Sequence, residues 1–163
     1  MTPGRLDFAI DVPVTSDWPN VEHLRSSVDR MIRLIAGDAA AGQTVSLVAA
    51  ELAENAIKYG AWREDAGTLR VRVWGDYPHA HVMVESPVGT GDEVPEGLSR
   101  TLSFISAYPS ALEAYQAKIA ERADSSDGAA SGLGLLRVSY EAGCTLRAEV
   151  EGATLRIVAD MEL

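Results

Sequence analysis

The residues best suited to chemistry are three polar side chains in an otherwise apolar segment, QTVSLVAAELAENAIKYG. Glu51, Asn55 and Lys58 are spaced at i, i+4 and i+7, which places them within about 60° of one another on a helix. Such a line can bind a metal-bridged phosphate, because a carboxylate can orient a water or hydroxyl, an amide oxygen can ligate Mg²⁺ and an ammonium can contact phosphate. The alternative is a solvated helix face on which Glu51 and Glu54 pair with Lys58.

A glycine turn is the second candidate feature. Ser131, Gly132, Leu133 and Gly134 form this turn, and a helix is expected from Leu133 to about Ala142. Gly132 and Gly134 have no side chain, so backbone N–H groups there can approach an anion at the N-terminus of the helix. The alternative is a turn whose leucines simply enter the core. Taken alone, the polar helix line is better explained as a solvated face, and the glycine turn as a purely structural turn.

Composition limits the classes of function. The 163 residues suffice for one domain, and a hydrophobic content of 47% suffices for its core. Fourteen Lys and Arg against 24 Asp and Glu give a net charge of −10, which argues against binding nucleic acid or an anionic membrane surface. The single Cys144 excludes an internal disulfide framework. Neither a signal peptide nor a transmembrane run is evident, so we expect a cytoplasmic domain.

Hydrophobic periodicity predicts the elements that position these residues. Strands are expected at residues 5–12, 68–74, 80–85, 145–150 and 154–159. Helices are expected at residues 21–36, 43–59 and 133–142, around Leu98 to Ile105, and after the capping box Ser110 to Glu113. Helices that are grouped rather than alternating with strands indicate an α+β, two-layer α/β sandwich, in which a mixed, mostly antiparallel sheet carries helices on one face.

Two segments together resemble motifs of the GHKL ATPase family, which includes ATP-binding domains of gyrase, heat-shock chaperones, histidine kinases and mismatch-repair proteins. ELAENAIKYG resembles the N-box of that family, and SGLGLLRV resembles its second glycine box. The expected order of elements is similar to the Bergerat-type fold of the family over nearly the whole chain. The resemblance implies a single domain, residues 1–163, with a helical lid-like insert at about residues 96–131.

The resemblance also implies ligands and roles by position. It implies ATP and Mg²⁺, with Asn55 as the metal ligand, Glu51 as the base or water-orienting group and Lys58 as a phosphate contact. The triphosphate would be lined by Ser131, Gly132, Leu133 and Gly134. Thr154, in the last hairpin, would sit near the adenine.

The sequence departs from the family at the first glycine box. The family has D-x-G-x-G after a strand, and its Asp accepts a hydrogen bond from the adenine amino group. Here the strand HVMVE continues into SPVGTGD. Alignment on Gly89 and Gly91 puts Pro87 at the position of the Asp, whereas strand alternation puts Ser86 there, and neither residue has a carboxylate.

As a stand-alone domain of this size, the chain is similar to the anti-sigma-factor and STAS-partner serine kinases of bacterial partner switching. The resemblance implies binding of Mg-ATP and phosphorylation or sequestration of a STAS-domain or sigma-factor-regulating partner, and a homodimer through the N-terminal strand. The missing carboxylate motivates an alternative, a degenerate, nucleotide-free interaction module. A small-molecule or dimerisation domain with incidental motifs is a third reading.

Overall fold

The computed structural model describes residues 4–15, 17–62, 67–123 and 133–163. The strands in this part of the chain are β1 (Arg5–Val14), β2 (Gly67–Asp76), β3 (His79–Pro87), β4 (Thr145–Glu151) and β5 (Thr154–Glu162). Its helices are α1 (Val21–Ala36), α2 (Ala39–Tyr59), α3 (Glu96–Ser106), α4 (Ala111–Ala123) and α5 (Leu133–Glu141).

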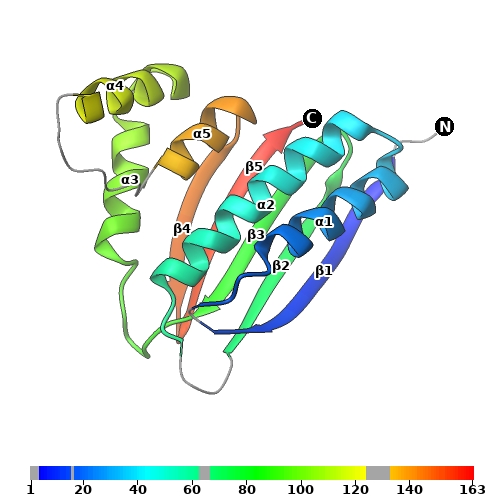
Figure 1. Ribbon diagram of the computed structural model, residues 1–163, viewed down its shortest axis with the longest axis horizontal. Helices are drawn as coiled ribbons and strands as arrows, with labels where there is room; N and C mark the ends of the chain where they lie inside the picture. The colour runs from blue at the N-terminus through cyan, green and yellow to red at the C-terminus, as the bar shows by residue number, and fades with distance from the viewer. Residues whose placement is uncertain (1–3, 16, 63–66, 124–132) are drawn as a thin grey trace.

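The strands form one sheet in the order β1-β2-β3-β5-β4, and α1, α2 and α5 lie over one of its faces (Figure 1). The expected α+β two-layer sandwich is therefore confirmed. Each of the four strand pairings among the described residues is antiparallel, so the sheet lacks the parallel pairing of a mixed sheet. The reason at β1 and β2 is that α1 and α2 form a helical hairpin, which returns the chain to the sheet in the opposite direction.

Helix α2 begins four residues before the expected start at Gln43. The Asp38 carboxylate caps it by accepting hydrogen bonds from the backbone N–H groups of Ala40 and Ala41, at 2.8 and 3.0 Å. Gly42 consequently lies inside the helix, where a Cβ would sit 2.6 Å from the Asp29 carboxylate of α1. The glycine thus permits a close approach of α1 and α2.

The core lies between α2 and the inner face of the sheet. Apolar residues of α2 are buried at each helical turn that faces the sheet, among them Val45, Val48, Ala49, Leu52, Ala53 and Ala56. Alternate residues of the central strands meet them, among them Val71, Val73, Val82, Val84 and Ile157. This packing fixes the orientation of α2 and therefore of the polar residues on its other side.

The opposite face of the sheet has no helix over it in the described part of the chain (Figure 1). It carries charged side chains in cross-strand ion pairs, including Arg72 with Asp7 at 3.7 Å and Arg70 with Asp11 at 3.5 Å. His81 stacks on Trp74 and contacts the Asp160 carboxylate. Such alternation of apolar and polar residues is typical of an antiparallel sheet that is covered on one side.

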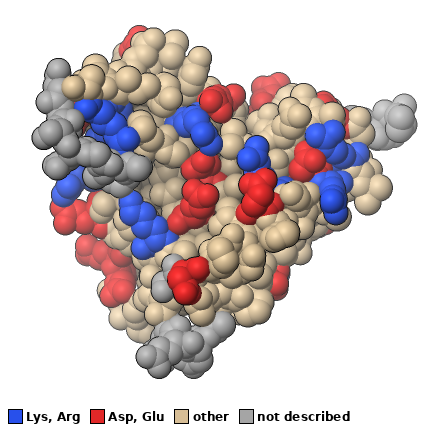
Figure 2. Space-filling model, viewed as in Figure 1, with Lys and Arg blue, Asp and Glu red and all other residues tan. Residues whose placement is uncertain are grey.

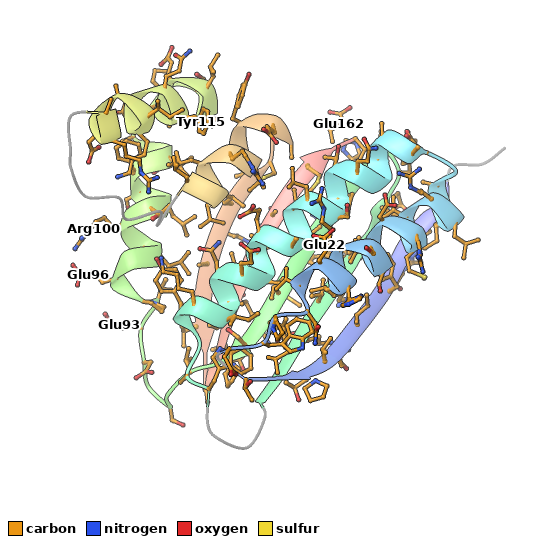
Figure 3. All side chains as sticks on the ribbon, in the orientation of Figure 1. Glu22, Glu93, Glu96, Arg100, Tyr115 and Glu162 are labelled. Atoms are coloured by element: carbon orange, nitrogen blue, oxygen red, sulfur yellow. The ribbon has the colours of Figure 1, made fainter. Side chains whose placement is uncertain are left out.

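Helices α3 and α4 form the described part of the expected lid-like insert. The Ser110 hydroxyl accepts a hydrogen bond from the Glu113 N–H at 3.2 Å, as the capping box predicted. Helix α4 packs on α5, where Tyr115, labelled in Figure 3, stacks on Tyr140. None of the described helices is both long enough and apolar enough to cross a bilayer.

Candidate functional site

Glu51 contacts α5 and is not paired with Lys58. Its Oε1 accepts a hydrogen bond from Nη2 of Arg137 at 2.8 Å, and its side chain is only 15% exposed. The Lys58 ammonium lies instead over the Tyr59 ring, 5.0 Å from the ring centroid. The alternative in which Glu51 belongs to a solvated ion-pair network with Lys58 is therefore wrong for this structure.

Gly134 lies directly against the same carboxylate. A Cβ on Gly134 would be 2.1 Å from Oε2 of Glu51, much closer than a real carbon and oxygen can approach. Position 134 therefore requires glycine as long as Glu51 keeps this orientation. The structure thus brings together two features that are far apart in the sequence, the polar line of α2 and the first turn of α5. Ser131 and Gly132 lie outside the described residues.

Burial raises the pKa of Glu51, and the nearby Glu54 and Glu141 carboxylates add to this effect. Arg137 and Arg25 act in the opposite direction and favour the ionised carboxylate. Arg137 extends between two acids, since its Nε is 4.0 Å from the Glu141 carboxylate. That Nε is buried without a hydrogen-bond partner among the described residues. Arg137 was not singled out by sequence, because only the packing of α5 on α2 reveals its role.

The amide of Asn55 makes one side-chain hydrogen bond within the described part of the chain. Its Nδ2 donates a hydrogen bond to the Glu51 backbone carbonyl, one helical turn earlier, at 2.7 Å, so its amide oxygen is the end available to a ligand. The described residues include no cluster of three or more His, Cys, Asp or Glu that could hold a metal. A cation at Asn55 would thus need oxygen ligands from outside the protein, as Mg²⁺ commonly takes from phosphates.

At the end of β3, alternation places Ser86 rather than Pro87 toward the helices, in line with the buried Val82 and Val84. Ser86 is 2% exposed, and its hydroxyl has no hydrogen-bond partner among the described residues. Thr154 pairs with Pro87 in the strand register and, by alternation, shares the face of Pro87 instead of that of Ser86. The structure therefore does not bring Thr154 next to Ser86 on the helical side of the sheet.

A cavity of about 310 Å³ lies where α2, α3, α4 and α5 meet, and the sequence did not predict it. Its lining residues are Tyr59, Gly97, Arg100, Thr101, Phe104, Lys118, Glu121 and Leu136. The one sequence signal for this cavity is the scarcity of lysine. The chain has two lysines, Lys58 and Lys118, and both lie near it: Lys118 lines the cavity, and Lys58 lies over the ring of Tyr59, which also lines it. Figure 2 shows acidic and basic side chains interleaved over this helical face rather than segregated.

The fold and this site define a two-layer α/β sandwich whose central helix α2 presents a polar line to α5. A solved structure has a similar fold: a chain in the crystal structure of the SiaB–SiaC complex from Pseudomonas aeruginosa. The two share 20% sequence identity with a TM-score of 0.66, over 97% of this chain and 90% of that chain. At this identity the likeness shows the fold alone. No protein-family model matches the sequence, and no curated protein does.

Proposed function

We propose that this chain is a regulatory protein of bacterial partner switching that binds Mg-ATP and phosphorylates a serine or threonine of a STAS-domain or sigma-factor-regulating partner. The observation that carries the proposal is the contact of the Glu51 carboxylate with Gly134 and Arg137 of α5, one helical turn from Asn55. The fold likeness to a chain from a complex of two proteins also supports a protein partner.

The residues present fit Mg²⁺ and phosphate. The amide oxygen of Asn55, which has no partner among the described residues, is a suitable ligand for a hard cation, and the exposed Lys58 ammonium lies one turn further along α2. The metal, when bound, would neutralise negative charge on the transferred phosphoryl group. The first turn of α5 would present backbone N–H groups to the same anion.

In the proposed phosphoryl transfer, Glu51 accepts the proton of the acceptor hydroxyl. The acceptor hydroxyl oxygen forms a bond to the γ-phosphorus while the bond from that phosphorus to the β,γ-bridging oxygen breaks, and ADP leaves with the electron pair. The hydroxyl proton passes to the Glu51 carboxylate, which must be ionised beforehand. The ion pair with Arg137 at 2.8 Å favours that ionised state and fixes the orientation of the carboxylate.

Calorimetric titration with ATP in the presence of Mg²⁺ tests the proposal. We expect binding by the unmodified protein and loss of the Mg²⁺-dependent part of the affinity in Asn55→Ala. Arg30→Gln is the matched control, since Arg30 is an exposed residue on α1 outside the site. No heat at high concentration of folded protein would exclude the kinase.

The buried Ser86 favours a second candidate, a nucleotide-free interaction module with the same fold. Where the GHKL family has an adenine-binding aspartate, this chain has a hydroxyl that is almost completely enclosed. For such a module we expect that ATP leaves the melting temperature unchanged and that Asn55→Ala leaves partner binding intact. A rise in melting temperature with Mg-ATP would decide against the module.

A further inference from the structure

Among the described residues, the end of β3 is closely packed around Ser86. Ser86 is 2% exposed, Leu155 opposite it in the register is fully buried, and Val88 is 8% exposed. A base could reach the Ser86 hydroxyl only by displacing side chains of the core. A nucleotide bound at Asn55 therefore needs another place for its base.

The cavity between the four helices lies at the end of the polar line of α2. Tyr59 lines the cavity and follows Asn55 by four residues, as Asn55 follows Glu51, so the three side chains share one side of the helix. The helical rise puts Tyr59 about 12 Å from Glu51 along the axis. Gly97 allows α3 to approach Tyr59, since a Cβ there would be 3.0 Å from the ring. One ligand could thus extend from the cavity past Asn55 toward Glu51.

The walls of the cavity suit a planar ring. Phe104 and Tyr59 supply aromatic surface, and Leu136, which is 1% exposed, supplies an apolar one. The volume of about 310 Å³ is within the range of ligand cavities. Two cations, Lys118 and Arg100, line the cavity. The Lys118 ammonium lies 5.0 Å from the centroid of the Phe104 ring, and the side chain is only 26% exposed, so it is the more enclosed of the two. Arg100 is 76% exposed, pairs with Glu96 and points away from α2 (Figure 3).

The polar groups of the cavity match the N7 edge of adenine. The Lys118 ammonium and the Glu121 carboxylate are 3.6 Å apart, so a donor stands beside an acceptor. Adenine offers the complementary edge, with the N7 acceptor beside the N6 amino donor, whereas guanine offers two acceptors, N7 and O6. Guanine held through this same N7 edge would place its O6 against the Glu121 carboxylate, which repels it.

We propose that the adenine of the bound nucleotide occupies this cavity against Phe104 and Tyr59, with Glu121 accepting from its amino group and Lys118 donating to a ring nitrogen. The inference rests on the proposed function, because it requires a bound nucleotide. It moves the base from the end of β3 to the helical insert, and it gives Glu121 the role of the carboxylate that Ser86 cannot fill.

Affinities for Mg-ATP and Mg-GTP, measured by calorimetry, test the placement. We expect the unmodified protein to prefer ATP. Glu121→Gln should weaken ATP binding about tenfold, because a neutral amide oxygen replaces the charged acceptor, and should narrow the preference for ATP over GTP. Phe104→Ala should weaken both nucleotides. Ser86→Ala and the control Arg30→Gln should leave both affinities unchanged.

The outcomes separate the inference from the proposed function. Loss of ATP affinity in Ser86→Ala, with Glu121→Gln and Phe104→Ala unaffected, would overturn the placement of the base and leave the kinase standing. Absence of ATP binding by the unmodified protein would overturn both. Photo-crosslinking with 8-azido-ATP gives an independent readout: labelled peptides from α3 or α4 support the inference, and labelled peptides from β3 overturn it. Glu121 is 61% exposed, so its substitution is compatible with folding.

Discussion

Gly134→Ala should destabilise the protein through Glu51. The new methyl carbon would lie 2.1 Å from Oε2 of Glu51, so the carboxylate must move by about 1 Å to reach van der Waals contact. That movement breaks or weakens the 2.8 Å hydrogen bond with Arg137. Loss of a hydrogen bond between charged groups costs about 1.5–3 kcal/mol, and the higher helix propensity of alanine offsets about 1 kcal/mol. We therefore expect a net loss of about 1 kcal/mol.

A double-mutant cycle measured by urea unfolding isolates this effect. In the Glu51→Ala background no carboxylate opposes the new methyl group, so Gly134→Ala should become neutral or stabilising by up to about 1 kcal/mol. The sign of the Gly134→Ala effect should thus reverse between the two backgrounds. Equal destabilisation in both would refute the reasoning, because the steric conflict would then lie elsewhere.

Three further predictions concern other groups. Arg137→Ala should cost about 1–2 kcal/mol in urea unfolding, since it leaves the mostly buried Glu51 carboxylate unpaired, whereas Arg30→Ala should stay within about 0.5 kcal/mol. Burial raises the pKa of Cys144 to about 11, so we expect no reaction with a thiol reagent at pH 8 until the protein is unfolded; fast labelling of the native protein would contradict this. Hydrogen bonds from Ala41 and Tyr77 lower the pKa of Asp38, so its contribution to stability is present above the unfolded-state pKa and is lost as the pH falls through the folded-state pKa. Asp38→Ala should therefore lower the melting temperature at pH 7, and the difference from the unmodified protein should shrink in acid.

The main elements could be predicted from sequence because their signals are local. The periodicity from Val21 to Ala36 and the alternation in both hairpins depend only on which face is buried. Helix α2 starts before the expected residue 43, because Asp38 caps it and the apolar periodicity becomes clear only after Gly42. The cap can be read from sequence, but the close contact of Gly42 with Asp29 cannot.

The site was only partly predictable, since it depends on contacts between distant segments. The line of Glu51 and Asn55 follows from helical spacing, but the close approach of Glu51 to Gly134 follows only from the packing of α5 on α2. Helix spacing alone paired Glu51 with Lys58, but α5 supplies a better partner in Arg137, and tertiary packing overrides the local rule. The cavity at Tyr59 requires four helices to be placed, so no local pattern could reveal it.

The ion pairs on the uncovered face of the sheet bear on strand register. A slip of β1 by one residue would turn Leu6 out of the core, so burial alone forbids it. A slip by two residues keeps the apolar face inward and is not excluded by burial. One such slip would place Asp7 directly opposite Asp76. Asp7 would then lose its ion pair with Arg72 and face a like charge instead. These half-exposed pairs contribute little to the free energy of unfolding, yet they distinguish registers that the hydrophobic pattern treats as equivalent.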